Sequence, residues 1–177
     1  MAAVNSSLVR GLKKLNPEQF ENLAYDILLL SGIQNLRWRT PSADGGRDLE
    51  GEVVSIDFSG ETTKQRWFIE CKRYAKSIDW PTVYEKLTIA INHQADYLLL
   101  VTTANVSVPC REEIQRHNER RNGVQIRVWP FYYLDQLLTL HGQVAVKYGL
   151  IRAPQSLHVD FESIMLELTK LAQATYA

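Results

Sequence analysis

The sequence contains few cysteines and lacks any arrangement of them that binds zinc. Its only two cysteines, Cys71 and Cys110, are far apart, so neither belongs to a CxxC pair. The four histidines are also scattered along the chain, at His93, His117, His141 and His158. This distribution argues against a cysteine–histidine zinc site. Isolated cysteines indicate reduced thiols, and we expect a cytoplasmic protein.

The sequence also lacks long apolar runs and an excess of charge of either sign. No apolar run approaches the ~18 residues that a membrane-spanning helix needs. Lys and Arg together number 20, and so do Asp and Glu, which gives a formal net charge of zero. Composition therefore gives no sign of nucleic-acid binding, and such a function would have to rest on local clusters of charge.

The first part of the chain predicts two helices. Leu8, Leu12 and Leu15 recur at helical spacing, and the absence of a continuous apolar segment argues against a targeting peptide. Asn-Pro-Glu-Gln at 16–19 combines a capping residue, a proline suited to the first helical position and a capping-box glutamine. We expect the second helix to begin there and to end near Gly32.

The remaining pattern predicts an α/β fold with a central mixed five-stranded sheet flanked by helices. Three strands should form an antiparallel meander, at residues 36–40, 48–57 and 66–74. Strands and helices then alternate: helix 79–93, strand 97–102, helix 109–121, strand 124–128 and helix 132–141. The late strand–helix–strand unit should be parallel and right-handed.

The length suits one domain, and we place it at residues 1–148. Residues 149–177 predict a linker followed by a C-terminal helix. That helix has an apolar stripe at helical spacing, formed by Phe161, Ile164, Leu168 and Leu171. The stripe is consistent with covering the core, with oligomerisation, or with leading into another domain.

The sequence Glu-Cys-Lys at 70–72 is the most informative local pattern. Side chains alternate along a strand, so Glu70 and Lys72 share one face while Ile69 and Cys71 share the other. We expect this strand to lie in the middle of the sheet, where charged side chains are rarely covered without a partner. A structural ion pair alone would account for these two residues, because Glu-x-Lys is common by chance.

Asp48 makes a functional explanation stronger. It follows Gly45 and Gly46, which allow a sharp turn or a close approach to a ligand, and it opens the strand before the one that carries Glu70. Antiparallel pairing would place Asp48 opposite Glu70. Two carboxylates at such a short distance repel each other unless a cation bridges them. Hard oxygen ligands suit Mg²⁺, with Mn²⁺ able to substitute. The alternative is a plain hairpin turn with a capping Asp.

Two further groups complete the predicted site. The backbone carbonyl of Cys71 would be a third metal ligand. Glu21 lies at the edge of the apolar stripe of its helix, within about 20° of Leu28, and either reaches the metal or faces solvent. Phosphodiester hydrolysis needs a metal to polarise the phosphate, and Lys72 would hold the attacking water or stabilise the developing charge.

The order Phe-Glu at 20–21, Gly-Gly-Arg-Asp ending at Asp48 and Glu-Cys-Lys-Arg-Tyr starting at Glu70 resembles the Mrr-type restriction endonuclease family of the PD-(D/E)xK nuclease superfamily. The resemblance covers roughly residues 16–140. It implies a restriction-endonuclease-like fold and a magnesium-dependent DNA endonuclease, often in bacterial defence. It also implies metal roles for Asp48 and Glu70, a catalytic role for Lys72 and an accessory acidic role for Glu21. Many members have Gln at the position of Glu70.

The predicted partner is double-stranded DNA. Arg47, Arg73 and Lys76 adjoin the site and are expected to contact phosphates. Arginines on helix 109–121 alternate with glutamates, so we favour a solvated face there. Cleavage of both strands usually needs two active sites, which predicts a homodimer or higher assembly. The alternatives are a catalytically silent DNA-binding or assembly module of the same fold, or a nuclease for DNA junctions or RNA.

Overall fold

The structure, a computed structural model, describes residues 6–39, 49–74, 76–121 and 123–152. Within them the chain forms one five-stranded sheet in the order β1-β2-β3-β4-β5. The strands are β1 (Gln34–Trp38), β2 (Leu49–Ile56), β3 (Thr62–Lys72), β4 (Tyr97–Thr102) and β5 (Gln125–Trp129). The predicted α/β class with a mixed five-stranded sheet is confirmed.

The helices also follow the predicted order. They are α1 (Ser6–Lys14), α2 (Pro17–Leu30), α3 (Trp80–Asn92), α4 (Val108–Glu119), α5 (Phe131–Leu140) and α6 (Gly142–Lys147). The short helix α6 was not predicted from the sequence. The start of α2 is as predicted, because the Asn16 side chain accepts from the Gln19 backbone amide at 2.7 Å while the Gln19 side chain accepts from the Asn16 amide at 2.9 Å.

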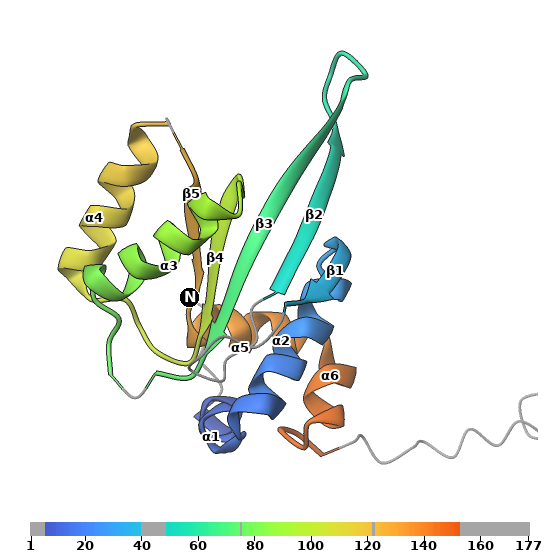
Figure 1. Cartoon of the computed structure of the whole chain (residues 1–177). Helices are drawn as coiled ribbons and strands as arrows, with labels where there is room; N and C mark the ends of the chain where they lie inside the picture. The colour runs from blue at the N-terminus through green and yellow to red at the C-terminus, as the bar shows by residue number, and fades with distance from the viewer. Residues whose placement is uncertain (1–5, 40–48, 75, 122, 153–177) are drawn as a thin grey trace, which may run out of the picture.

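The sheet is antiparallel on one side of β3 and parallel on the other. β1, β2 and β3 form the predicted meander, and β3, β4 and β5 run parallel with α3 and α4 as their connections. β3 is therefore the central strand. It is longer than predicted at its start, because residues 62–65 pair with residues 53–56 in a hairpin that extends beyond the helices (Figure 1).

Helices cover the two faces of the sheet unequally. α1, α2, α5 and α6 pack on one face around a core that includes Phe20, Ile69 and Leu99. α3 and α4 pack on the other face around Phe68, Leu98 and Ile126, beside β4 and β5 (Figure 1). We call these the first face and the second face of the sheet. The alternation along β3 determines which of its side chains reach each one.

Two predicted segments lie outside the described residues. They are the turn that carries Arg47 and Asp48, and the C-terminal stripe of residues 161–171. Among the described residues, no helix is both long and apolar enough to cross a membrane.

Gly51 on β2 provides a test of the packing between the sheet and the segment before β1. A Cβ atom there would meet the Ile33 side chain closer than carbon atoms can approach, and the Leu36 side chain at 3.2 Å. We expect Gly51→Ala to lower the free energy of unfolding by about 1–3 kcal/mol through overpacking, measured by urea denaturation. Gly123→Ala is the matched control, because no atom lies within 4 Å of its added methyl group. Equal stability of both variants would contradict the predicted clash.

Candidate active site

The alternation predicted along β3 is present. Ile69 and Cys71 are buried in the core of the first face, and Phe68 is buried in the core of the second face. Glu70 and Lys72 follow Phe68 at intervals of two residues and therefore share its face. Glu70 is 5% exposed, whereas Lys72 is exposed at the end of the strand.

The partner of Glu70 is a lysine from a different element. The Nζ atom of Lys86 on α3 lies 3.3 Å from Oε1 of Glu70, and the two side chains are 8% and 6% exposed. Glu85 also approaches Lys86, at 3.7 Å, but its own side chain is 69% exposed. The ammonium group therefore joins a buried carboxylate on the sheet to an exposed carboxylate on the helix.

Such a buried pair is costly to assemble. Removing two charges from water costs several kcal/mol per ion, and the mutual attraction offsets this cost only with good geometry. Ionisable groups held in this way are concentrated at functional sites. The pair therefore marks the second face around Glu70 as a candidate active site.

Sequence reasoning missed Lys86, although a signal was present. Val83, Leu87 and Ala90 define the inward face of α3, and Lys86 lies three residues after Val83. Residues three apart on a helix are neighbours on its surface, so Lys86 occupies the inward side. A lysine at an inward position of an amphipathic helix is a buried charge that needs a partner.

The structure places the neighbours of Asp48 but not Asp48 itself. Leu49 pairs with Ile69 in the antiparallel ladder of β2 and β3, so the residue after Asp48 is opposite the residue before Glu70. Asp48 and Arg47 lie outside the described residues. Glu70 fits a hard divalent cation by its chemistry. Within the described part of the chain no cluster of three His, Cys, Asp or Glu side chains could hold a metal.

Glu21 lies on the opposite side of the sheet from Lys86. It is 9% exposed on α2, whose apolar residues pack against Ile69 and Cys71 on the first face. It is therefore buried, rather than a boundary residue facing solvent.

Arg73 and Lys76, the predicted phosphate contacts, line one cavity. The cavity has a volume of about 440 Å³, lies where β3 and β4 end, and is also lined by Lys13. Arg73 is half-buried, and its Nη1 atom donates to the backbone oxygens of Lys13, at 3.0 Å, and Leu15. Arg73 thus holds the end of α1 against the sheet, whereas Lys76 is exposed. Lys13, Arg73 and Lys76 therefore give this cavity a positively charged lining.

Comparison with known proteins identifies the family of the chain. A family model named Mrr_cat and described as a restriction endonuclease matches residues 12–138, which include Glu21, Glu70, Lys72 and Lys86. The chain belongs to the Mrr-type restriction endonuclease family. Membership in this family supports the general assignment of this Mrr-family domain as an endonuclease, which is a hydrolase. No protein with curated annotation matches the chain.

Two solved structures share the fold of this Mrr-family domain. One is the DNA modification-dependent restriction endonuclease AspBHI, with 23% identity, a TM-score of 0.62 and 81% of the present chain covered. The other is the MspJI restriction endonuclease in complex with a 27-mer oligonucleotide, with 14% identity, a TM-score of 0.53 and 79% covered. The present chain spans 38% and 32% of the lengths of these two proteins. At such identities the likeness shows the fold.

Proposed function

We propose that this chain is a magnesium-dependent endonuclease that hydrolyses DNA phosphodiester bonds, as the effector domain of a bacterial restriction or anti-phage defence protein. The observation that carries the proposal is the placement of Glu70 and Lys72 on one face of the central strand, beside the buried ammonium group of Lys86. Family membership supports the nuclease chemistry.

The metal would be held where β2 begins and β3 ends. Continuing the ladder by one residue beyond the Leu49–Ile69 pair would bring Asp48 opposite Glu70. The two carboxylates and the backbone carbonyl of Cys71 are then the protein ligands for Mg²⁺, with Mn²⁺ able to substitute. When bound, the ion would polarise the scissile phosphate and offset its developing charge.

The lysines of the site have separate roles in this proposal. Lys72 is exposed at the end of β3, where its ammonium group would hold the attacking water or stabilise the charge that develops on the phosphate. Lys86 is buried and holds the Glu70 carboxylate in one orientation through their 3.3 Å contact. It is therefore a positioning residue rather than a catalytic one.

Double-stranded DNA is the proposed partner. Both solved structures that share the fold are restriction endonucleases, and one of them was determined with an oligonucleotide. The phosphates beside Lys72 would be contacted by Arg47, Lys76 and Arg73. Lys13 lines the same cavity as Arg73 and Lys76 and adds a further positive charge. A dimer, or a higher assembly, would supply the second active site for the second strand.

Plasmid cleavage tests the proposal. We expect supercoiled DNA to be nicked or linearised in Mg²⁺ or Mn²⁺, and to remain intact when EDTA removes the ion. Glu70→Ala should abolish cleavage and weaken Mn²⁺ binding measured by calorimetry, because it removes an oxygen ligand for a hard cation. Glu85→Ala is the matched control, since Glu85 also approaches Lys86 but is exposed. Intact plasmid under all metal conditions would contradict the proposal.

A further inference from the structure

A cleft of about 740 Å³ lies on the second face of the sheet, next to the candidate active site. Arg37 of β1 is paired with Glu50 of β2, and Glu50 is paired with Phe68 of β3, so the three side chains form one row across the sheet. Phe68 precedes Glu70 by two residues, which places this row about 6–7 Å from Glu70 along the strand. The cleft and the Glu70 site are therefore neighbours on the second face of the sheet.

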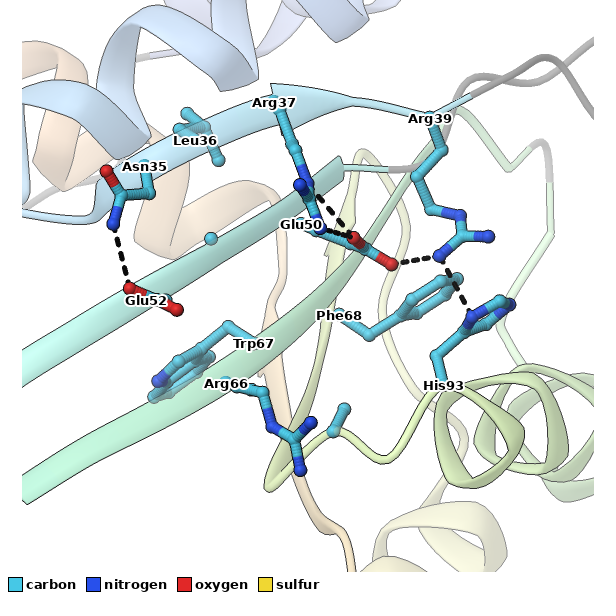
Figure 2. Close-up of a pocket in the computed structure, with 12 residues that line it drawn as sticks. Asn35, Leu36, Arg37, Arg39, Glu50, Glu52, Arg66, Trp67, Phe68 and His93 are labelled. Carbon is cyan, nitrogen blue, oxygen red and sulfur yellow. Dashed lines mark hydrogen bonds and ion pairs between the residues drawn. The ribbon is translucent and has the colours of Figure 1, made fainter.

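Two arginines in the cleft share one carboxylate. Arg37 donates to Oε2 of Glu50 from Nε at 3.3 Å and from Nη2 at 3.0 Å, while Arg39 is paired with Oε1 (Figure 2). Burial by itself would raise the pKa of Glu50, but the hydrogen bonds and charges of the two arginines hold it below its usual value. The Glu50 carboxylate thus stays ionised and holds both guanidinium groups in place. Together, Arg37, Arg39 and Glu50 carry a net charge of +1.

The surrounding groups orient Arg39 further. Its Nη1 atom lies 2.9 Å from Nδ1 of His93, and its guanidinium carbon lies 5.9 Å from the centre of the Phe68 ring. The His93 ring is stacked on Phe68 with the centroids 5.7 Å apart. Figure 2 shows Phe68 and His93 together beneath Arg39. A guanidinium group held in this way loses less conformational freedom when it binds an anion.

Arg66 extends the cationic surface by one more row. It is paired with Glu52 in the ladder, so it lies on the same face two residues before Phe68, and it is exposed. The Glu52 side chain accepts instead from Asn35, at 2.8 Å. The side chains that line the cleft include three arginines and two glutamates, which leaves an excess of positive charge on a chain whose formal net charge is zero.

We propose that this cleft binds the sugar–phosphate backbone of the DNA strand on one side of the scissile phosphate, with Arg37, Arg39 and Arg66 as the phosphate contacts. This inference rests on the proposed nuclease function and defines where its substrate lies. The strand would leave the cleft toward Lys72, which is exposed where β3 ends. Arginine suits the role because its planar group presents several donors to phosphate oxygens.

Binding measured by fluorescence anisotropy tests the inference. The full chain is mixed with a labelled duplex in EDTA, so that the DNA stays intact, at a series of salt concentrations. We expect Arg37→Ala/Arg66→Ala to weaken binding at least tenfold and to lower the slope of log K against log [salt] by about 2, because two phosphate contacts are lost. Both residues are exposed, and an unchanged melting temperature would verify the fold.

Arg111→Ala/Arg120→Ala is the matched control. It removes the same charge from two exposed residues, Arg111 on α4 and Arg120 at the C-terminal cap of α4. This helix packs beside β5 at the sheet edge opposite β1. Binding by the control should equal that of the wild type. Equal losses in the two double variants, or no loss in the first, would overturn the inference and leave Mg²⁺-dependent plasmid cleavage untouched.

The same assay distinguishes the nucleic acids. An RNA duplex of the same sequence should compete less well than the DNA duplex; stronger competition by RNA that depends on Arg37 and Arg66 would overturn the choice of DNA. A wild-type chain that fails to bind the DNA duplex would overturn the inference as well. Plasmid cleavage measured in parallel then reports separately whether the proposed function stands.

Discussion

Replacing Lys72 with Ala should lower the rate of DNA cleavage by about 100-fold or more, a loss typical of removing one group that stabilises transition-state charge. Lys72 is exposed at the end of β3, so its removal should change the free energy of unfolding by no more than about 0.5 kcal/mol. The measurement is single-turnover cleavage of a plasmid at saturating protein, together with urea denaturation. A large loss of rate without a loss of stability would identify a chemical role.

Lys64→Ala is the matched control for this prediction. Lys64 is an exposed lysine on the same strand, at the hairpin end where it is paired with Val54, and it is remote from Glu70. Its replacement removes the same charge and should leave the rate within about twofold, since the effect of a screened distant charge is small. A Lys72→Ala variant that cleaves as fast as Lys64→Ala would remove Lys72 from the proposed chemistry.

Replacing Lys86 with Met should destabilise the fold by about 3–5 kcal/mol, because it leaves the buried Glu70 carboxylate without its counter-charge on α3. Methionine is unbranched and apolar, so most of the loss should come from the charge rather than from packing. The midpoint of urea denaturation at neutral pH measures the effect.

A second substitution separates charge from packing. In Glu70→Gln/Lys86→Met both charges are absent, and we expect the double variant to recover much of the stability that Lys86→Met loses. Lys147→Met is the comparison at the surface. Lys147 forms an ion pair with Asp26 at 2.6 Å, and the lysine side chain is 61% exposed. Loss of this surface pair should lower the free energy of unfolding by less than about 1 kcal/mol. A Lys86→Met variant no less stable than Lys147→Met would show that the buried pair contributes little.

The two lysines differ in how far the sequence revealed them. Lys72 could be assigned because it is two residues from Glu70 on a strand, and the alternation of side chains determines their common face. Lys86 is fourteen residues beyond Lys72, on a helix that reaches Glu70 only by packing on the sheet. Its inward position follows from the pattern of α3, but the side chain it meets does not.

In the antiparallel part of the sheet, too, some features could be predicted from the sequence and others could not. The sequence predicted β2 and β3 as neighbours, and the structure pairs Leu49 with Ile69, in the register that the predicted closeness of Asp48 and Glu70 needs. The sequence did not predict that Arg37, Arg39 and His93 would meet around Glu50. These four residues come from β1 and the segment just after it, from β2 and from the C-terminal cap of α3, and no local pattern connects them.

The sequence by itself determined the α/β class, the order of strands and helices, the capping of α2 and the shared face of Glu70 and Lys72. These features depend on helix and strand periodicity and on turn chemistry, which act between residues close in the chain. The tertiary structure alone decided that Lys86 neutralises Glu70 and that a cleft with three arginines adjoins them. Both depend on how distant elements pack and in which register strands pair, which is set by contacts between residues far apart in the chain.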